Sequence, residues 1–108
     1  MVTDNESLEW EKVCAFQEEV GKWAKSINPN GTDKSLITHI RRELDELEQA
    51  ENFDDKQMEA ADVFLILLDF AERNEFDLFL AGKVKFKICQ NRDWNPPDSE
   101  GVVSHKKE

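Results

Sequence analysis

Apolar side chains recur at steps of three and four residues through the first half of the chain, which is the spacing of one face of an α-helix. The first such stripe consists of Val13, Phe16, Val20, Trp23 and Ile27. It predicts a helix over about residues 7–26, before the turn residues 28–31. A second stripe consists of Leu36, Ile40, Leu44 and Leu47. It predicts a helix that Thr32 or Asp33 caps and that fades near Glu51.

A third helix is predicted in the middle of the chain. Asp54 with Gln57 resembles a capping box at its start. The run over 60–71 that follows has only Asp62 and Asp69 as polar members. A helix that is apolar nearly all round belongs in the middle of a bundle.

A fourth helix is predicted to begin at the cap Asp77 and to end near Trp94, because Asn95 precedes Pro96. It would turn three apolar side chains inward, namely Leu80, Val84 and Ile88. No segment alternates apolar and polar residues as a strand does, so we expect no sheet. The expected fold is all-α, an antiparallel helical bundle of about four helices with an extended C-terminal tail.

Length and charge narrow the classes of function. A chain of 108 residues is expected to form a single domain over 1–108, with the helical body at about 7–94 and the tail at 95–108. The formal net charge of -10 repels phosphate backbones and anionic lipids, so nucleic acids and membranes are not expected as partners. We expect no export signal and no membrane span, and two widely separated cysteines favour the cytoplasm.

Two pairs of acids at a spacing of three residues lie on the second and third predicted helices. Glu43 and Glu46 border the apolar stripe of the second helix and do not point away from it. On the third helix, Glu59 and Asp62 fall with Asp69 in a sector of about 80° by the helical period. Acidic pairs are common in so acidic a chain, so this spacing alone is a weak signal.

Acids that border a core need a cation, since two like charges about 4 Å apart repel by about 4 kcal/mol at an effective dielectric of 20. One alternative is an ion pair with Arg41, Arg42 or Lys56. The other is a divalent metal such as Mg²⁺, which takes oxygen ligands and keeps waters for substrate phosphates. His39 shares the face of Glu43 and is either a structural hydrogen-bonding residue or part of such a site.

A basic stretch without acids lies on the fourth predicted helix. Its cations are Lys83, Lys85, Lys87 and Arg92. Lys85 and Arg92 share one helix face, which could present both to a triphosphate. The alternative is that these residues only offset the acidity of the chain. Acids suited to Mg²⁺ on two helices and cations on another are the components of phosphoryl-group chemistry, here without a P-loop.

Taken in order, these residues resemble a known signature. Glu43-x-x-Glu46, twelve intervening residues and then Glu59-x-x-Asp62 are similar to the E-x-x-E and E-x-x-D motifs of the all-α nucleotide pyrophosphohydrolases, the MazG-like superfamily. The stretches 85–94 and 97–105 carry an R-x-W and a P-D-x-x-G-V-V-x-H ending. They are similar to the dATP/dGTP pyrophosphohydrolase domain that phages and prophages often encode.

The resemblance implies a metal-dependent hydrolysis of a nucleoside triphosphate, with a deoxynucleotide expected, to the monophosphate and pyrophosphate. Such an activity controls nucleotide pools. The acids that would hold Mg²⁺, with Mn²⁺ as an alternative ion, and carry the catalysis are Glu43, Glu46, Glu59 and Asp62. The residues that would bind the substrate are Lys85, Arg92, Trp94 and His39.

Two positions depart from the resemblance. Arg42 stands where many members of the superfamily have a further glutamate, which leaves the water-activating base unassigned. Cys89 stands where similar sequences have asparagine, and Asn91 would face differently. These departures keep a second hypothesis open, a non-catalytic helical module that binds a nucleotide or another protein.

The resemblance also implies a homodimer or homotetramer that completes the bundle. Trp94 and the tail over 97–105 could close over the nucleotide, including one bound by a second copy, or Trp94 could simply pack at a helix end. Trp10 and Trp23 are expected to pack in the core or at an interface. For a phage-encoded protein the expected place of action is the cytoplasm of the host.

Overall fold

The computed structural model describes residues 4–107, and side chains from residue 8 onward. Its helices are α1 (Asp4–Ile27), α2 (Asp33–Gln49), α3 (Phe53–Arg73) and α4 (Leu78–Gln90). The described residues contain no strand, and the tail adds one isolated antiparallel bridge between Trp94 and His105. The expected all-α class with four helices is confirmed. A membrane-spanning segment is not found among the described helices, each of which is too short or too polar.

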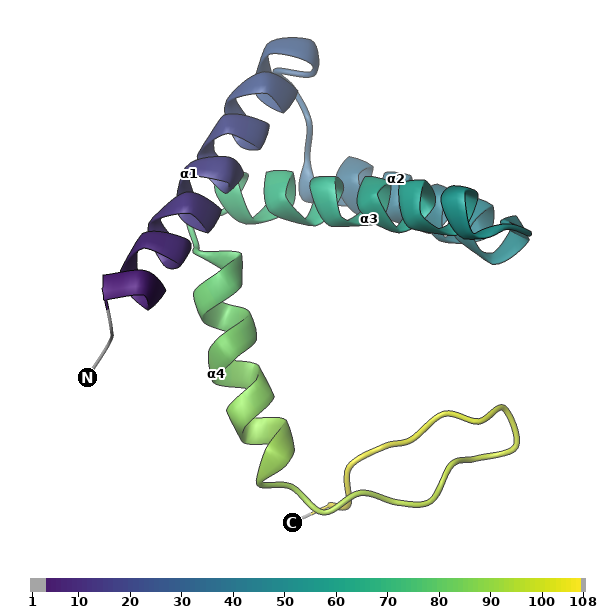
Figure 1. Ribbon diagram of the computed structural model, residues 1–108. Helices are drawn as coiled ribbons and strands as arrows, with labels where there is room; N and C mark the ends of the chain where they lie inside the picture. The colour runs from purple at the N-terminus through teal and green to yellow at the C-terminus, as the bar shows by residue number, and fades with distance from the viewer. Residues whose placement is uncertain (1–3, 108) are drawn as a thin grey trace.

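The helices meet at one end of an antiparallel pair (Figure 1). α2 and α3 lie side by side, and α1 packs across α3 near the end where α3 finishes and α2 begins. α4 starts near the same end and runs away from the pair, packing on α1 and α3 but not on α2. The tail forms a loop beyond the end of α4 (Figure 1).

The core lies at this crossing of helices. Its buried apolar side chains are Val20, Leu36, Ile66, Leu68 and Ala71. Gly21 of α1 permits the close approach, since a Cβ atom at this position would lie 2.7 Å from Cβ of Glu72. Any larger residue would therefore push α1 away from α3.

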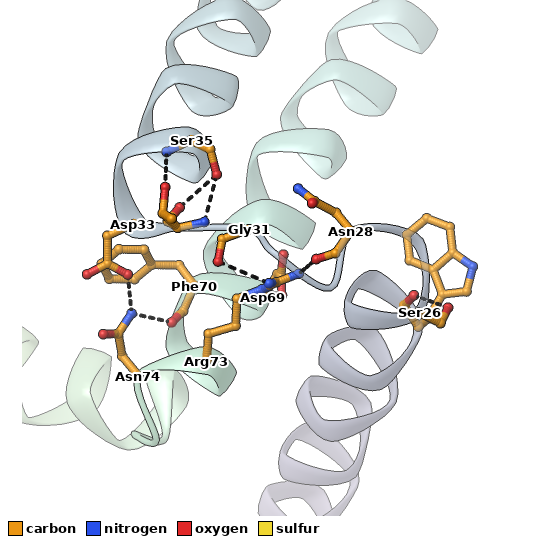
Figure 2. Close-up of polar contacts among 11 residues, drawn as sticks. Ser26, Asn28, Gly31, Asp33, Ser35, Asp69, Phe70, Arg73 and Asn74 are labelled. Carbon is orange, nitrogen blue, oxygen red and sulfur yellow. Dashed lines mark hydrogen bonds and ion pairs between the residues drawn. The ribbon is translucent and has the colours of Figure 1, made fainter.

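A buried ion pair ties the α1–α2 connection to the end of α3 (Figure 2). Nε of Arg73 donates to Oδ1 of the buried Asp69 at 2.8 Å. The same guanidinium donates to the carbonyl oxygens of Asn28 at 2.9 Å and of Gly31 at 3.3 Å. Because one fixed cation satisfies the carboxylate and two carbonyl groups, the connection is held against α3.

Polar side chains of α1 hold the start of α4. The buried amide of Gln17 donates to the carbonyl oxygen of Phe76 at 2.8 Å and accepts from the backbone N–H of Leu78 at 3.1 Å. These bonds satisfy two backbone polar groups at the sharp turn between α3 and α4, where Glu75 adopts a φ of 59°.

Asp77 is the N-cap of α4 and also a contact of α1. Its carboxylate accepts from the backbone N–H of Leu80 at 3.1 Å, from the indole of Trp10 at 2.9 Å and from the thiol of Cys14 at 3.3 Å. Burial alone would raise the pKa of Asp77, but these hydrogen bonds outweigh it and the pKa is lowered.

Two of the predicted helix ends are wrong. Thr32 and Asp77 cap α2 and α4 as expected, but α3 begins earlier than predicted. Its N-cap is Asn52, whose side chain accepts from the backbone N–H of Asp55 at 2.9 Å, and Asp54 lies inside the first turn. α4 ends at Gln90 and not near Trp94, because the indole of Trp94 turns back to donate to the carbonyl oxygen of Cys89.

The expected inward stripe of α4 is not buried within the chain. Leu80, Val84 and Ile88 are 48%, 55% and 42% exposed. Phe64 and Leu67 of α3 are also exposed. Because α4 leaves the α2–α3 pair, these side chains stay exposed among the described residues.

Replacement of Arg73 by methionine is expected to lower the free energy of unfolding by about 3 kcal/mol, because Asp69 then stays buried without a partner. Chemical denaturation measures the change. The double variant Asp69→Leu, Arg73→Met should recover much of the loss, since no charge is left uncompensated. The control Arg41→Met alters an exposed arginine of α2, and an equal loss in this control would contradict the role of the ion pair.

Candidate metal centre

Three carboxylates from two helices converge on the α2–α3 pair. Glu43 and Glu46 lie one turn apart on α2, and Glu59 faces them from the first half of α3. One carboxylate oxygen from each lies within 4.8 Å of the other two. The antiparallel packing of α2 on α3 therefore brings together acids that are distant in the sequence.

Two oxygens of this cluster lack a hydrogen-bond donor. Glu43 and Glu59 are half-buried, whereas Glu46 is exposed. Oε2 of Glu43 and Oε2 of Glu59 are buried and have no partner among the described residues. A buried carboxylate oxygen without a donor is costly. A cation bound between the three carboxylates would satisfy both atoms.

The pKa values of two members of the cluster, Glu43 and Glu59, are raised. Burial is the largest cause that raises the pKa of Glu43 and of Glu59, and the carboxylate of Glu46 raises both further. The charge of Asp62 acts in the same direction on each. His39 opposes it by lowering the pKa of Glu43. A half-buried group of like charges with raised pKa values is a common property of functional sites.

Asp62 borders the cluster without joining the three converging oxygens. It lies one turn beyond Glu59 on α3 and is exposed. Its charge nonetheless reaches Glu43 and Glu59 strongly enough to raise the pKa of each. The structure thus brings carboxylate oxygens of three of the four predicted acids within 4.8 Å of one another, and Asp62 lies one turn from Glu59.

No lysine or arginine neutralises this cluster among the described residues. The basic side chain that does pair with it is His39, whose Nε2 lies 3.3 Å from Oε1 of Glu43. Of the acids considered from the sequence, only Asp69 has an arginine partner, and that partner is Arg73. Arg73 was not among the predicted ion-pair partners, although its spacing of four residues from Asp69 on one helix was the available signal.

The other predicted substrate-binding residues lie away from the cluster in the single chain. Lys85 is exposed on α4, which does not pack on α2. Arg92 follows the end of α4 and is half-buried. Trp94 packs edge-on against His105 with ring centroids 6.2 Å apart. Their roles toward phosphate and nucleotide therefore stay predictions.

The donor set of the cluster suits a hard divalent cation. It consists of carboxylate oxygens alone, without the thiolate or paired imidazole ligands that select zinc. Mg²⁺ and Mn²⁺ take such oxygens while keeping coordination positions for water or phosphate. The orphaned oxygens of Glu43 and Glu59 are consistent with this fit.

The four helices and their acid cluster define the class of the protein as a MazG-like all-α fold. A solved structure to which the chain is similar is the MazG-like pyrophosphohydrolase of cyanophage S-2L, bound to dGDP and three catalytic Mn²⁺ ions per active site. The two are 26% identical with a TM-score of 0.76, over 88% of this chain and 97% of the other. This likeness confirms the resemblance to the MazG-like superfamily and to its phage proteins.

No protein-family model matches the sequence, and neither does any curated protein.

Replacement of Glu59 by glutamine is expected to stabilise the metal-free protein at pH 7. Groups whose pKa is raised by folding bind protons more tightly in the folded state, so their ionisation costs stability as the pH rises above the ordinary glutamate value of 4.5. The gain in melting temperature should be present at pH 7 and shrink as the pH falls toward 4.5.

Thermal unfolding over this pH range measures the effect. The control Asp45→Asn removes an exposed acid of α2 outside the cluster and should leave the pH dependence unchanged. A gain for Glu59→Gln that is equal at all pH values would argue against like-charge repulsion as its cause.

Proposed function

We propose that this chain is a metal-dependent nucleoside triphosphate pyrophosphohydrolase, which cleaves a deoxynucleoside triphosphate to the monophosphate and pyrophosphate. The convergence of the oxygens of Glu43, Glu46 and Glu59 within 4.8 Å, without a lysine or arginine paired to them among the described residues, carries the proposal. Nucleotide-pool control in the cytoplasm, including that of a phage host, is the role that this activity would serve.

The neighbour of known structure supports the choice of substrate. It is a pyrophosphohydrolase whose structure contains dGDP and catalytic Mn²⁺ ions. Nucleotide and divalent cation together are what an all-carboxylate cluster on a helical pair is suited to handle. The acids proposed to hold Mg²⁺, or Mn²⁺ in its place, are Glu43, Glu46, Glu59 and Asp62.

Each residue of the proposed site would have its own role in substrate binding and catalysis. A bound divalent cation supplies charge neutralisation of the triphosphate and lowers the pKa of a bound water. The carboxylates of Glu43, Glu46 and Glu59 would hold such a cation beside the phosphate end of the substrate. His39, one turn before Glu43, can donate to a phosphate or sugar oxygen. Lys85 and Arg92 would bind the phosphates as permanent charges.

We further propose that the active form is a homodimer or homotetramer in which cations of one copy serve the acids of another. Lys85 lies on a helix that does not pack on α2 of its own chain, and its apolar neighbours on that helix are uncovered. A second copy that covers α4 would supply the missing packing. Trp94 and the tail would then lie close to the shared site.

Purified protein with Mg²⁺ and each deoxynucleoside triphosphate in turn is expected to release pyrophosphate. Glu59→Gln and Asp62→Asn should each lower the rate by at least about a hundredfold, since electrostatic stabilisation by a bound metal contributes several kcal/mol. The control Asp45→Asn, an exposed acid of the same helix pair, should keep the rate. Absence of pyrophosphate with every nucleotide would favour the non-catalytic module.

Mixing two inactive variants tests the shared site. If Glu59→Gln and the double variant Lys85→Ala, Arg92→Ala exchange subunits, one site in each mixed dimer regains all its residues. About a quarter of the wild-type activity should then return in an equal mixture. Sedimentation of the wild-type protein measures the assembly itself. Activity that stays absent in a mixture with proven exchange would place both sets of residues on one chain.

A further inference from the structure

Three polar side chains on one face of α1 contact the start of α4. Trp10, Cys14 and Gln17 follow one another at steps of four and three residues, which places them on the same side of the helix. Trp10 and Cys14 donate to Asp77, which lies 67 and 63 positions further along the chain. These contacts are therefore made by the tertiary fold and not by the local sequence.

The two carboxylate oxygens of Asp77 have different partners. Oδ1 accepts from the backbone N–H of Leu80 at 3.1 Å and so caps α4. Oδ2 accepts from the indole of Trp10 at 2.9 Å and from the thiol of Cys14 at 3.3 Å. An N-cap needs only one side-chain oxygen. Oδ2 is thus free to join α4 to α1, and we call Trp10, Cys14 and Oδ2 of Asp77 the α1–α4 clasp.

The α1–α4 clasp is a second attachment of α4 to α1. The bonds of Gln17 hold the turn before α4, where Glu75 has a φ of 59°. A helix attached at one place can still change its direction about that place. Cys14 and Trp10 lie three and seven residues before Gln17 on α1. Two separated attachments fix a direction that one of them would leave open.

Side-chain packing along α4 constrains its direction weakly. α4 packs on α1 and α3 but not on α2, and it runs away from the α2–α3 pair (Figure 1). An apolar groove of about 480 Å³ is lined by residues of α1, α3 and α4, among them Val13, Phe64 and Gly82. A Cβ atom at Gly82 would meet nothing within 4 Å, and Phe86 is 65% exposed. The polar contacts at the start of α4 therefore have the larger part in setting its angle.

The direction of α4 determines where its basic side chains lie. Lys85 is eight residues after Asp77, about 12 Å along the helix axis at 1.5 Å for each residue. A rotation of α4 by about 10° at Asp77 would move the backbone of Lys85 by about 2 Å. Charge-assisted hydrogen bonds have N–O distances of about 2.7–2.9 Å, so a displacement of this size weakens a contact with phosphate.

We propose that the α1–α4 clasp fixes the direction of α4 and thereby positions Lys85 and Arg92 for the phosphates of the substrate. Trp10, Cys14 and Asp77 are positioning residues under this proposal, and none of them belongs to the acid cluster. The part that concerns Lys85 and Arg92 rests on the proposed function. The part that concerns the direction of α4 does not.

Residual dipolar couplings of the backbone amides measure the angle between α1 and α4 in solution. Asp77→Asn keeps Oδ1 for the cap but turns an NH₂ group toward two donors, and Trp10→Phe removes one donor while keeping an aromatic ring. Both variants are expected to shift the angle by about 10° or more, or to reduce the couplings of α4 relative to those of α1. Far-UV circular dichroism should show unchanged helix content.

The matched control Asp33→Asn removes an exposed carboxylate in the first turn of α2 and should leave the couplings of α4 unchanged. If the angle and the couplings of α4 stay as in the wild type in both Asp77→Asn and Trp10→Phe, the proposal is overturned, whatever the activity of the protein.

Steady-state kinetics separate positioning from a purely structural role. Asp77→Asn and Trp10→Phe are expected to raise KM for the triphosphate by at least about fivefold with kcat within about twofold, because Lys85 and Arg92 bind the phosphates before and during the reaction. Loss of folded protein alone would instead lower the apparent kcat at an unchanged KM. Cys14→Ser keeps a donor toward Oδ2 of Asp77 and should retain the wild-type KM, whereas Cys14→Ala should raise it.

The outcomes distinguish this proposal from the proposed function. A changed direction of α4 in a protein that hydrolyses no triphosphate would support the α1–α4 clasp and overturn the activity. Hydrolysis with an unchanged KM despite a changed direction would overturn the positioning of Lys85 and Arg92. A lower kcat with an unchanged KM and an unchanged direction would show that the α1–α4 clasp contributes to stability alone.

Discussion

The repulsion among Glu43, Glu46 and Glu59 is the constraint around which the rest of the fold is arranged. Like charges within 4.8 Å favour separation of α2 from α3, and burial of two of the three makes their ionisation more costly. The packing at the opposite end of the helix pair has to hold the two helices together against this force. A site that destabilises its own scaffold in the absence of ligand is common where function sets the sequence.

Asp62 and Asp69 show how two acids on one face of α3 come to lie in different surroundings. They are seven residues apart on one face, yet Asp69 is buried against Arg73 and Asp62 is exposed beside the acids. The residue four positions after Asp69 is an arginine, whereas the residue four positions after Asp62 is Ile66. A partner at helical spacing makes one carboxylate structural. Asp62 has no such partner among the described residues, which is consistent with its proposed place in the site.

Periodicity and capping chemistry predicted the helices well because both are local. The stripe of α2 and its cap Thr32 need only nearby residues, and the pairing of the E-x-x-E and E-x-x-D motifs follows once α2 and α3 lie antiparallel. The predicted start of α3 was wrong because Asn52 and Asp54 are both good caps, and only the tertiary fold selects between them. The place where α1 crosses α3 could not be predicted, since a pattern on α1 does not reveal which face of α3 it packs on.

The exposure of the apolar stripe of α4 could not be predicted either, because it also depends on the tertiary arrangement. Helical spacing predicts that Leu80, Val84 and Ile88 share a face, but it cannot say whether the cover comes from the same chain. Exposed apolar side chains cost about 25 cal/mol for each Å² left in water, so a helix with this stripe is more stable when covered. Lys85 adjoins the stripe and also lacks an ion-pair partner among the described residues. An acidic surface of a neighbouring molecule that packed on α4 would cover the apolar stripe and pair with Lys85. The acids of a second copy have that chemistry.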